Sequence, residues 1–136
     1  MKLQTVKSQK LPIQSEQDIV KVRRLVREWA VQANFSLLQQ TKLMTATSEL
    51  ARNIFRYAGS GIVQLNLVNN GLRTGLNIVF EDQGPGIADI NLAMRDSYST
   101  GGSLGMGLGG TRRLMDQFNI TSEVGVGTMV TITLWR

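Results

Sequence analysis

A glutamate and an asparagine four residues apart, Glu49 and Asn53, are the first side chains in this sequence that could do chemistry. In a helix this spacing places both on one face, about one turn apart. The chain contains neither Cys nor His, which excludes thiol nucleophiles, disulfides, thiolate zinc sites and the commonest general base. Any catalysis must therefore use carboxylates, amides, hydroxyls, backbone dipoles or a bound ion. Alone, an ExxxN pattern is common on helix surfaces.

A second motif begins at Asp82 and reads DxGxG, with Gly84, Pro85 and Gly86 after the aspartate. A buried carboxylate here could accept a hydrogen bond from an exocyclic amine such as N6 of adenine, and the glycines would let a base lie against the backbone. A turn that starts at Asp and is stiffened by Pro explains the same residues. The motif by itself does not decide between the two.

The stretch from Ser99 to Gly110 is dense in glycine and runs into a predicted helix. Backbone amides at such a junction, together with the helix dipole, favour phosphate groups. No Lys follows the glycines, so the stretch is not a P-loop, and no strand leads into it, as a dinucleotide fingerprint requires. A lid that folds over phosphates is the prediction, and a plain linker is the alternative.

A fourth motif, GxGT, occupies Gly125 to Thr128 between two predicted strands. A tight hairpin alone would explain its glycines. Ten of the fourteen glycines of the chain lie from Gly84 onward, in the last three motifs. Their placement, more than their number, is the informative feature.

The elements that must position these motifs change from helices to strands along the chain. An apolar stripe after an N-cap at Ser15 predicts a helix over about 16–34. A second helix is expected after Ser36, with Gly59 as its stop. Alternating apolar residues over 62–68, a turn at 69–71 and a further alternating run through Leu76, Ile78 and Phe80 predict a hairpin.

Beyond the loop at 81–86 the pattern becomes mixed. We expect a short helix near 89–95, the glycine loop at 99–110, a third helix over about 111–118 that turns Phe118 inward, and a closing hairpin of 120–124 and 128–135. Helices and hairpins without regular βαβ alternation indicate an α/β fold, a two-layer sandwich with a mostly antiparallel sheet. No repeat or linker interrupts the sequence, so one domain over 1–136 is expected.

Charge is concentrated near the N-terminus: residues 1–60 sum to +6 and residues 61–136 to −1, for a net charge of +5. A solvated basic helix face is the simplest explanation, and a docking surface for an acidic protein is the alternative. Nucleic acid is not an expected partner, because no aromatic residues are interleaved with the basic ones. No stretch is long and apolar enough for a spanning helix, and the N-terminus lacks a signal-peptide core. We therefore expect a cytoplasmic protein with no membrane partner.

Taken in order, the four motifs resemble the N, G1, G2 and G3 boxes of the GHKL ATP-binding superfamily, over nearly the whole chain. More narrowly, four stretches are similar to the RsbT-type serine/threonine switch kinases of stressosomes, which are relatives of anti-sigma-factor kinases. These stretches are SELARN at 48–53, EDQGPGI at 81–87, YSTGG at 98–102 and RRLMD at 112–116. The absence of His excludes a self-phosphorylating histidine kinase.

The resemblance implies a Bergerat-type fold, with a mostly antiparallel mixed sheet covered on one face by helices, and it implies ATP and Mg²⁺ as ligands. It implies that Glu49 is the general base and that Asn53 is a Mg²⁺ ligand through its side-chain oxygen. It also implies that Asp82 fixes the adenine amine, that Gly86 allows close approach of the base, and that Thr128 reaches the same pocket.

The nucleotide-binding set implied by the resemblance runs through all four boxes. Amides around Gly105, Gly107 and Gly109 would hold the phosphates. The whole set is Asn53, Asp82, Gly84, Gly86, Ile87, Ser99, Thr100, Gly101, Gly105, Met106, Gly107, Leu108, Gly109 and Thr128. Four arginines are candidates for charge neutralisation or partner contact: Arg52, Arg56, Arg112 and Arg113.

The substrate implied by the resemblance is a Ser or Thr on a STAS-domain scaffold or antagonist protein, after which the freed kinase would activate a PP2C-type phosphatase. One alternative within the family is an anti-sigma factor that binds a sigma factor and phosphorylates its antagonist. An alternative of another class is a nucleotide-sensing module without transfer activity. A basic nucleic-acid binder is a third, and it would show a steep salt dependence of affinity.

Overall fold

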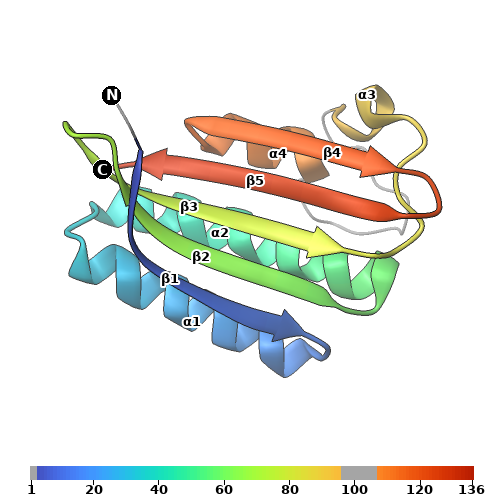
Figure 1. Ribbon diagram of the computed structural model, residues 1–136, viewed down its shortest axis with the longest axis horizontal. Coiled ribbons are helices and arrows are strands. Elements are labelled where there is room, and N and C mark those ends of the chain that lie inside the picture. The colour runs from blue at the N-terminus through green and yellow to red at the C-terminus, as the bar shows by residue number, and fades with distance from the viewer. Residues whose placement is uncertain (1–2, 96–106) are drawn as a thin grey trace.

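The computed structural model describes residues 3–95 and 107–136, which form a two-layer α/β sandwich (Figure 1). The strands are β1 (Gln4–Ile13), β2 (Gly61–Asn69), β3 (Thr74–Asp82), β4 (Gln117–Glu123) and β5 (Gly127–Trp135). The helices are α1 (Glu16–Gln32), α2 (Leu37–Asn53), α3 (Ile90–Ala93) and α4 (Gly107–Leu114), with a π-helical turn, η1 (Ile54–Ala58), directly after α2. The sandwich and its helices agree with the fold class predicted from the sequence.

The sheet has the order β1-β2-β3-β5-β4, and its four strand pairs are all antiparallel. Helices α1, α2 and α4 lie on the same side of the sheet, behind it in Figure 1. The core fills the space between the two layers, with side chains such as Val26, Leu43, Leu65 and Ile78 almost fully buried. The opposite face of the sheet carries no described helix.

Helices α1 and α2 begin at the residues that the sequence indicates. Ser15 caps α1 by accepting a hydrogen bond from the backbone N–H of Asp18 (3.3 Å). Ser36 and Gln39 form a reciprocal capping box at the start of α2, with bonds of 2.9 and 3.1 Å. The helical segment ends at Gly59, whose φ of +80° suits a residue without Cβ. The predicted stop is confirmed, although the last turn is a π-helix and not an α-helix.

The third helix was predicted in the wrong place. The sequence predicts it over about 111–118, but α4 spans Gly107–Leu114, and Phe118 belongs to β4. Glycine disfavours helix in isolation, and this preference is overridden here by packing. Gly109 and Gly110 are buried, and α4 packs against α2.

Strand β1 was not predicted from the sequence at all. Most of its residues are exposed, since it lies at the edge of the sheet, and its alternation of apolar and polar residues is therefore weak. A register irregularity between Thr5 and Lys7 interrupts its pairing with β2. Among the described residues, no helix is long and apolar enough to cross a membrane.

Candidate active site

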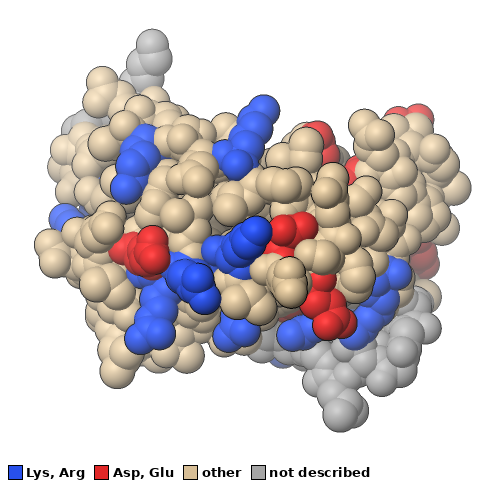
Figure 2. Space-filling model, turned by 90° about the horizontal axis from the view of Figure 1, so that it is seen from below, with Lys and Arg blue, Asp and Glu red and all other residues tan. Residues whose placement is uncertain are grey.

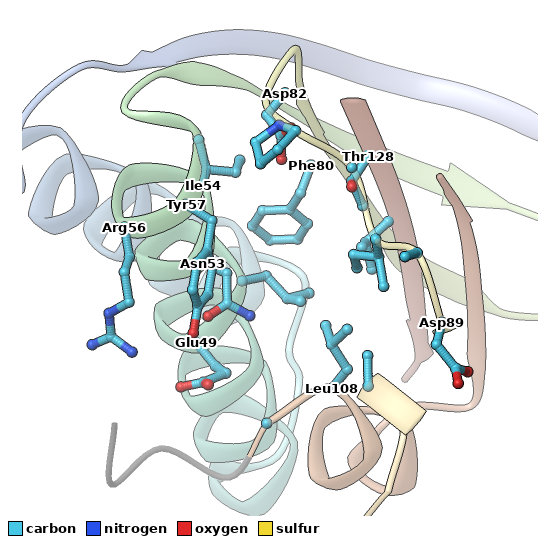
Figure 3. Close-up of a pocket in the computed structure, with 18 of the residues that line it drawn as sticks. Glu49, Asn53, Ile54, Arg56, Tyr57, Phe80, Asp82, Asp89, Leu108 and Thr128 are labelled. Carbon is cyan, nitrogen blue, oxygen red and sulfur yellow. The ribbon is translucent and has the colours of Figure 1, made fainter. Parts of the chain in front are cut away.

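A pocket of about 390 Å³ opens on the helix side of the sheet, between α2, η1, α3 and the start of α4 (Figure 3). The floor comes from the end of β3 and the start of β5, through Phe80, Asp82, Thr128 and Val130. The volume falls in the range of small-molecule sites, and most of the wall is apolar with a few polar groups at defined points. Such a wall suits a flat ring with polar atoms at its edge.

Glu49 and Asn53 both line this pocket from α2, one turn apart. The side chain of Glu49 is only 8% exposed, and its Oε2 lies 3.5 Å from the guanidinium of Arg52. Its other carboxylate oxygen has no partner among the described residues. The amide of Asn53 points into the pocket (Figure 3) and has no hydrogen-bond partner in the part of the chain that the structure describes. An oxygen of each side chain is thus available to a ligand.

The opposite end of the pocket is built where strands β3 and β5 pair. Asp82 accepts a hydrogen bond from the backbone N–H of Gly84 through Oδ1 (2.9 Å), which leaves Oδ2 for a ligand. Thr128 is the register partner of Asp82, and its hydroxyl lies 2.8 Å from Oγ of Ser122. Ser122 also accepts a hydrogen bond from the N–H of Ile87 (2.7 Å). Ser122 therefore links the DxGxG loop to the GxGT hairpin.

Contacts within the protein explain why glycine is needed in these two motifs. Gly86 has a φ of +77°, and a Cβ added there would lie 2.4 Å from the carbonyl oxygen of Glu123. A Cβ at Gly127 would lie 2.1 Å from the carbonyl oxygen of Asp82. The N–H of Gly125 donates to the carbonyl of Pro85 (2.9 Å). The glycines therefore let the two motifs touch, whereas the sequence suggested close approach to a base as the reason for Gly86.

The structure brings most of the described candidate residues together. Those that line the pocket are Glu49, Asn53, Asp82, Gly86, Ile87, Gly107, Leu108 and Thr128. Gly84 and Gly109 are near it but not in its wall; a Cβ at Gly84 would meet Ala58 at 2.7 Å. Ser99, Thr100, Gly101, Gly105 and Met106 lie outside the described residues.

The four candidate arginines have different positions. Arg56 lines the pocket, and Arg52 contacts Glu49. Arg112 lines a second hollow together with Arg95 and lies away from the wall of the first. Arg113 is exposed on the last turn of α4.

Several lining residues were not predicted as part of the site: Leu50, Ile54, Tyr57, Phe80, Asp89, Leu92, Ala93 and Val130. Phe80 and Val130 lie two residues from Asp82 and Thr128 along their strands, so strand alternation could have placed them on the same face. The residues of α3 reach the pocket only because the chain folds back toward α2, so no local sequence pattern indicates them. Asp89 caps α3 by accepting a hydrogen bond from the N–H of Leu92 (3.0 Å).

Comparison with known proteins gives consistent results. Residues 38–136 match the family described as histidine kinase-, DNA gyrase B-, and HSP90-like ATPase. The chain is 46% identical over 123 residues to serine/threonine-protein kinase RsbT of Bacillus subtilis (strain 168), covering 90% of this chain and 92% of the relative. It is 29% identical over 117 residues to an anti-sigma F factor of Thermoanaerobacter sp. (strain X514), covering 82% and 80%.

Two solved structures share the fold. The structure of the RsbU and RsbW domains of a Mycobacterium tuberculosis protein matches with a TM-score of 0.64 at 19% identity; the match covers 94% of this chain and 33% of that one. The mycobacterial sensor histidine kinase MprB matches with a TM-score of 0.57 at 14% identity, covering 95% and 97%. At such low identity these similarities concern the fold alone.

Proposed function

Because this chain belongs to the family of histidine kinase-, DNA gyrase B- and HSP90-like (GHKL) ATPases, we propose that it is an ATP-dependent serine/threonine protein kinase that acts through the pocket described above. One observation carries the proposal. A nearly buried carboxylate, Glu49, and the amide of Asn53, which has no partner among the described residues, open onto the same pocket as Asp82 and Thr128.

The two ends of the pocket suit the two ends of ATP. Asp82 and Thr128 lie toward one end, and Glu49 and Leu108 toward the other (Figure 3). Adenine fits the apolar end, where Oδ2 of Asp82 would accept a hydrogen bond from its amine. The phosphates would then lie toward α2 and the start of α4, where backbone N–H groups of the first helical turn favour anions.

Asn53 is the residue that we propose to hold Mg²⁺. Amide oxygens are among the ligands that Mg²⁺ accepts, and the ion usually takes its other ligands from water and phosphate. The described residues contain no cluster of three or more carboxylates that could hold a metal by themselves. When bound, Mg²⁺ would neutralise charge on the phosphate oxygens.

Glu49 would act as the general base of the transfer. The hydroxyl oxygen of a substrate Ser or Thr forms a bond to the γ-phosphorus while the bond from that phosphorus to the β–γ bridging oxygen breaks, and the electron pair leaves with ADP. The hydroxyl proton passes to Glu49. The Arg52 contact involves only Oε2 of the carboxylate, so Oε1 is available to accept the proton.

The protein substrate that we propose is a STAS-domain scaffold or antagonist, and the proposed downstream partner is a PP2C-type phosphatase. The 46% identity to a serine/threonine-protein kinase supports a protein Ser or Thr as the phosphoryl acceptor, and the STAS and PP2C partners follow from the resemblance of the four motif stretches to stressosome switch kinases. Since the phosphoryl donor is ATP, we expect the reaction to take place in the cytoplasm. The test is to incubate the protein with Mg²⁺, γ-labelled ATP and purified STAS proteins from the same organism, followed by phosphoamino acid analysis. Labelled phosphoserine or phosphothreonine is expected; absence of label on every STAS protein would contradict the proposal.

An anti-sigma factor kinase is the second candidate, supported by the 29% identity to an anti-sigma F factor. The two candidates differ in the protein that the kinase binds after transfer. Affinity capture with the purified chain as bait distinguishes them: a PP2C-type phosphatase is expected for a switch kinase, and a sigma factor for an anti-sigma factor. The intact Glu49 argues against a nucleotide-sensing module without transfer activity.

A further inference from the structure

Ser122 connects two of the motifs through three polar contacts, although it belongs to neither motif. Its Oγ accepts a hydrogen bond from the backbone N–H of Ile87 (2.7 Å), lies 3.1 Å from the carbonyl oxygen of Gly127 and lies 2.8 Å from Oγ1 of Thr128. A serine hydroxyl has one proton to donate and two lone pairs that accept. Three contacts therefore use its full capacity.

The chemical types of these partners decide where each proton points. The Ile87 N–H can only donate, and the Gly127 carbonyl can only accept. Ser122 gives its own proton to Gly127, and the proton of Thr128 fills the remaining contact. This is the one arrangement that places a proton in each of the three contacts. If Ser122 instead donated to Thr128, two oxygens would face each other across 3.1 Å with no proton between them.

A Thr128 hydroxyl that donates to Ser122 can only accept from a ligand in the pocket. Thr128 lines the pocket beside Asp82, its register partner on β3, whose Oδ2 has no partner among the described residues. An ionised carboxylate also only accepts. Asp82 and Thr128 thus form a pair of acceptors, and neither presents a proton to a ligand.

Surface charge does not distinguish one nucleoside triphosphate from another. Basic side chains are exposed on α1, among them Lys21, Arg23 and Arg27. Figure 2, seen from the side of α1, shows more Lys and Arg than Asp and Glu. A positive surface attracts ATP and GTP alike, because both carry the same triphosphate. A choice between the two must come from contacts with the base.

The two purines differ at carbon 6. Adenine carries an amino group there, with N–H bonds to donate, whereas guanine carries a carbonyl oxygen, which can only accept. A guanine in the same pose would place that oxygen against two acceptors with no proton between them. Unpaired polar groups in a closed site lower affinity strongly, which is how sites reject close analogues.

We propose that Ser122 is a positioning residue for base selection: it accepts the proton of Thr128, keeps that hydroxyl an acceptor, and so makes the pocket prefer adenine over guanine nucleotides. Ser122 is not in the wall of the pocket, so it acts through Thr128 and not on the base. The inference rests on the proposed function, since it requires the base to lie against Asp82 and Thr128.

The test compares the dissociation constants of ATP and GTP, measured by calorimetry, for wild-type protein and Ser122→Ala. Wild-type protein is expected to bind ATP at least about a hundredfold more tightly than GTP. In Ser122→Ala the Thr128 hydroxyl can turn and donate to the guanine oxygen, so the ratio of the two constants should fall at least about tenfold. A merely structural role for Ser122 would weaken both nucleotides by the same factor and leave the ratio unchanged.

Three further variants sharpen the comparison. Ser122→Thr retains the hydroxyl and should keep the ratio close to that of wild type. Thr121→Ala removes a hydroxyl from the adjacent, exposed position of β4, and as the matched control it should bind both nucleotides like wild type. If Ser122→Ala does not fold, Ser122→Cys replaces the oxygen by a weakly accepting sulfur and should lower the ratio in the same direction.

Two results would overturn the role of Ser122 alone. One is an unchanged ratio in a folded Ser122→Ala or Ser122→Cys variant, and the other is wild-type protein that binds GTP as tightly as ATP. Either result leaves the kinase assignment standing if ATP still binds and its phosphoryl group is transferred. Wild-type protein that does not bind ATP at all would overturn the proposed function and this inference with it.

Discussion

Glu49 has one described partner, the guanidinium of Arg52, in an ion pair between a nearly buried carboxylate and an arginine that is 45% exposed. The pair restrains one carboxylate oxygen and leaves the other toward the pocket. Because the Arg52 side chain of this pair is 45% exposed, solvent screens the interaction and its contribution to folding is small. Its consequence should therefore be found in turnover. We expect Arg52→Ala to lower kcat for phosphoryl transfer several-fold while KM for ATP changes little, and Arg52→Lys to retain most of kcat. A drop in kcat as large for Arg52→Lys as for Arg52→Ala would contradict a role for the charge.

Asp82 offers a test of nucleotide binding that is separate from turnover. Asn at this position can still accept the hydrogen bond from Gly84 N–H, but it lacks the negative charge that we propose contacts the adenine amine. A hydrogen bond to a charged group contributes ~1.5–3 kcal/mol, so Asp82→Asn should weaken ATP binding at least about tenfold by calorimetry. Asp116→Asn is the matched control, because Asp116 also accepts a backbone N–H (from Trp135, 2.8 Å) but lies outside the pocket. Equal affinity in both variants would refute the assignment of Asp82.

At the scale of elements, contact between the DxGxG loop and the β4–β5 hairpin should depend on Gly86. Ala at Gly86 would meet the Glu123 carbonyl at 2.4 Å and would also strain a φ of +77°. Gly125 has a φ of +81° but open space around it, so Gly125→Ala carries the strain without the clash. We expect Gly125→Ala to cost about 1 kcal/mol of unfolding free energy and Gly86→Ala clearly more, in chemical denaturation. Equal losses of unfolding free energy in the two variants would show that the β4–β5 hairpin can move away from the loop, and would contradict the prediction.

The elements that sequence predicted well are those with local signals. Ser15 and Ser36 are caps that act within one turn, and the turn at 69–71 lies between strands of clear alternation. The start of α4 and the whole of β1 were missed because both depend on tertiary contacts, helix packing in one case and edge pairing in the other.

In the candidate site, too, the residues with a local sequence signal were predicted and those placed by tertiary contacts were not. Glu49, Asn53, Asp82 and Thr128 could be found because their motifs occur in order along the chain. The wall from α3 and the role of Ser122 could not, since local sequence does not indicate which loops will touch.

At the scale of the whole molecule, the pocket lies on the helix side of the sheet, so a substitution on the opposite face of the sheet should leave nucleotide binding unchanged. ATP at about 100 times its dissociation constant should stabilise the protein by ~2.7 kcal/mol. Thr131 lies on the face of the sheet opposite the helices, next to the core residue Ile132. We expect the resulting rise in melting temperature to be the same in Thr131→Lys as in wild type, and to be reduced in Asp82→Asn. A smaller rise in Thr131→Lys would mean that the two sides of the sheet are coupled.

The most direct test of the kinase assignment is the rate of phosphoryl transfer to a purified STAS-domain substrate by Glu49→Gln, with ATP affinity measured on the same preparation. Glu28→Gln, at an exposed position of α1, is the control. General-base catalysis contributes about 10²–10⁴-fold, so Glu49→Gln should lower the transfer rate at least about a hundredfold while ATP affinity stays near that of wild type. Transfer by Glu49→Gln at the wild-type rate would contradict the account.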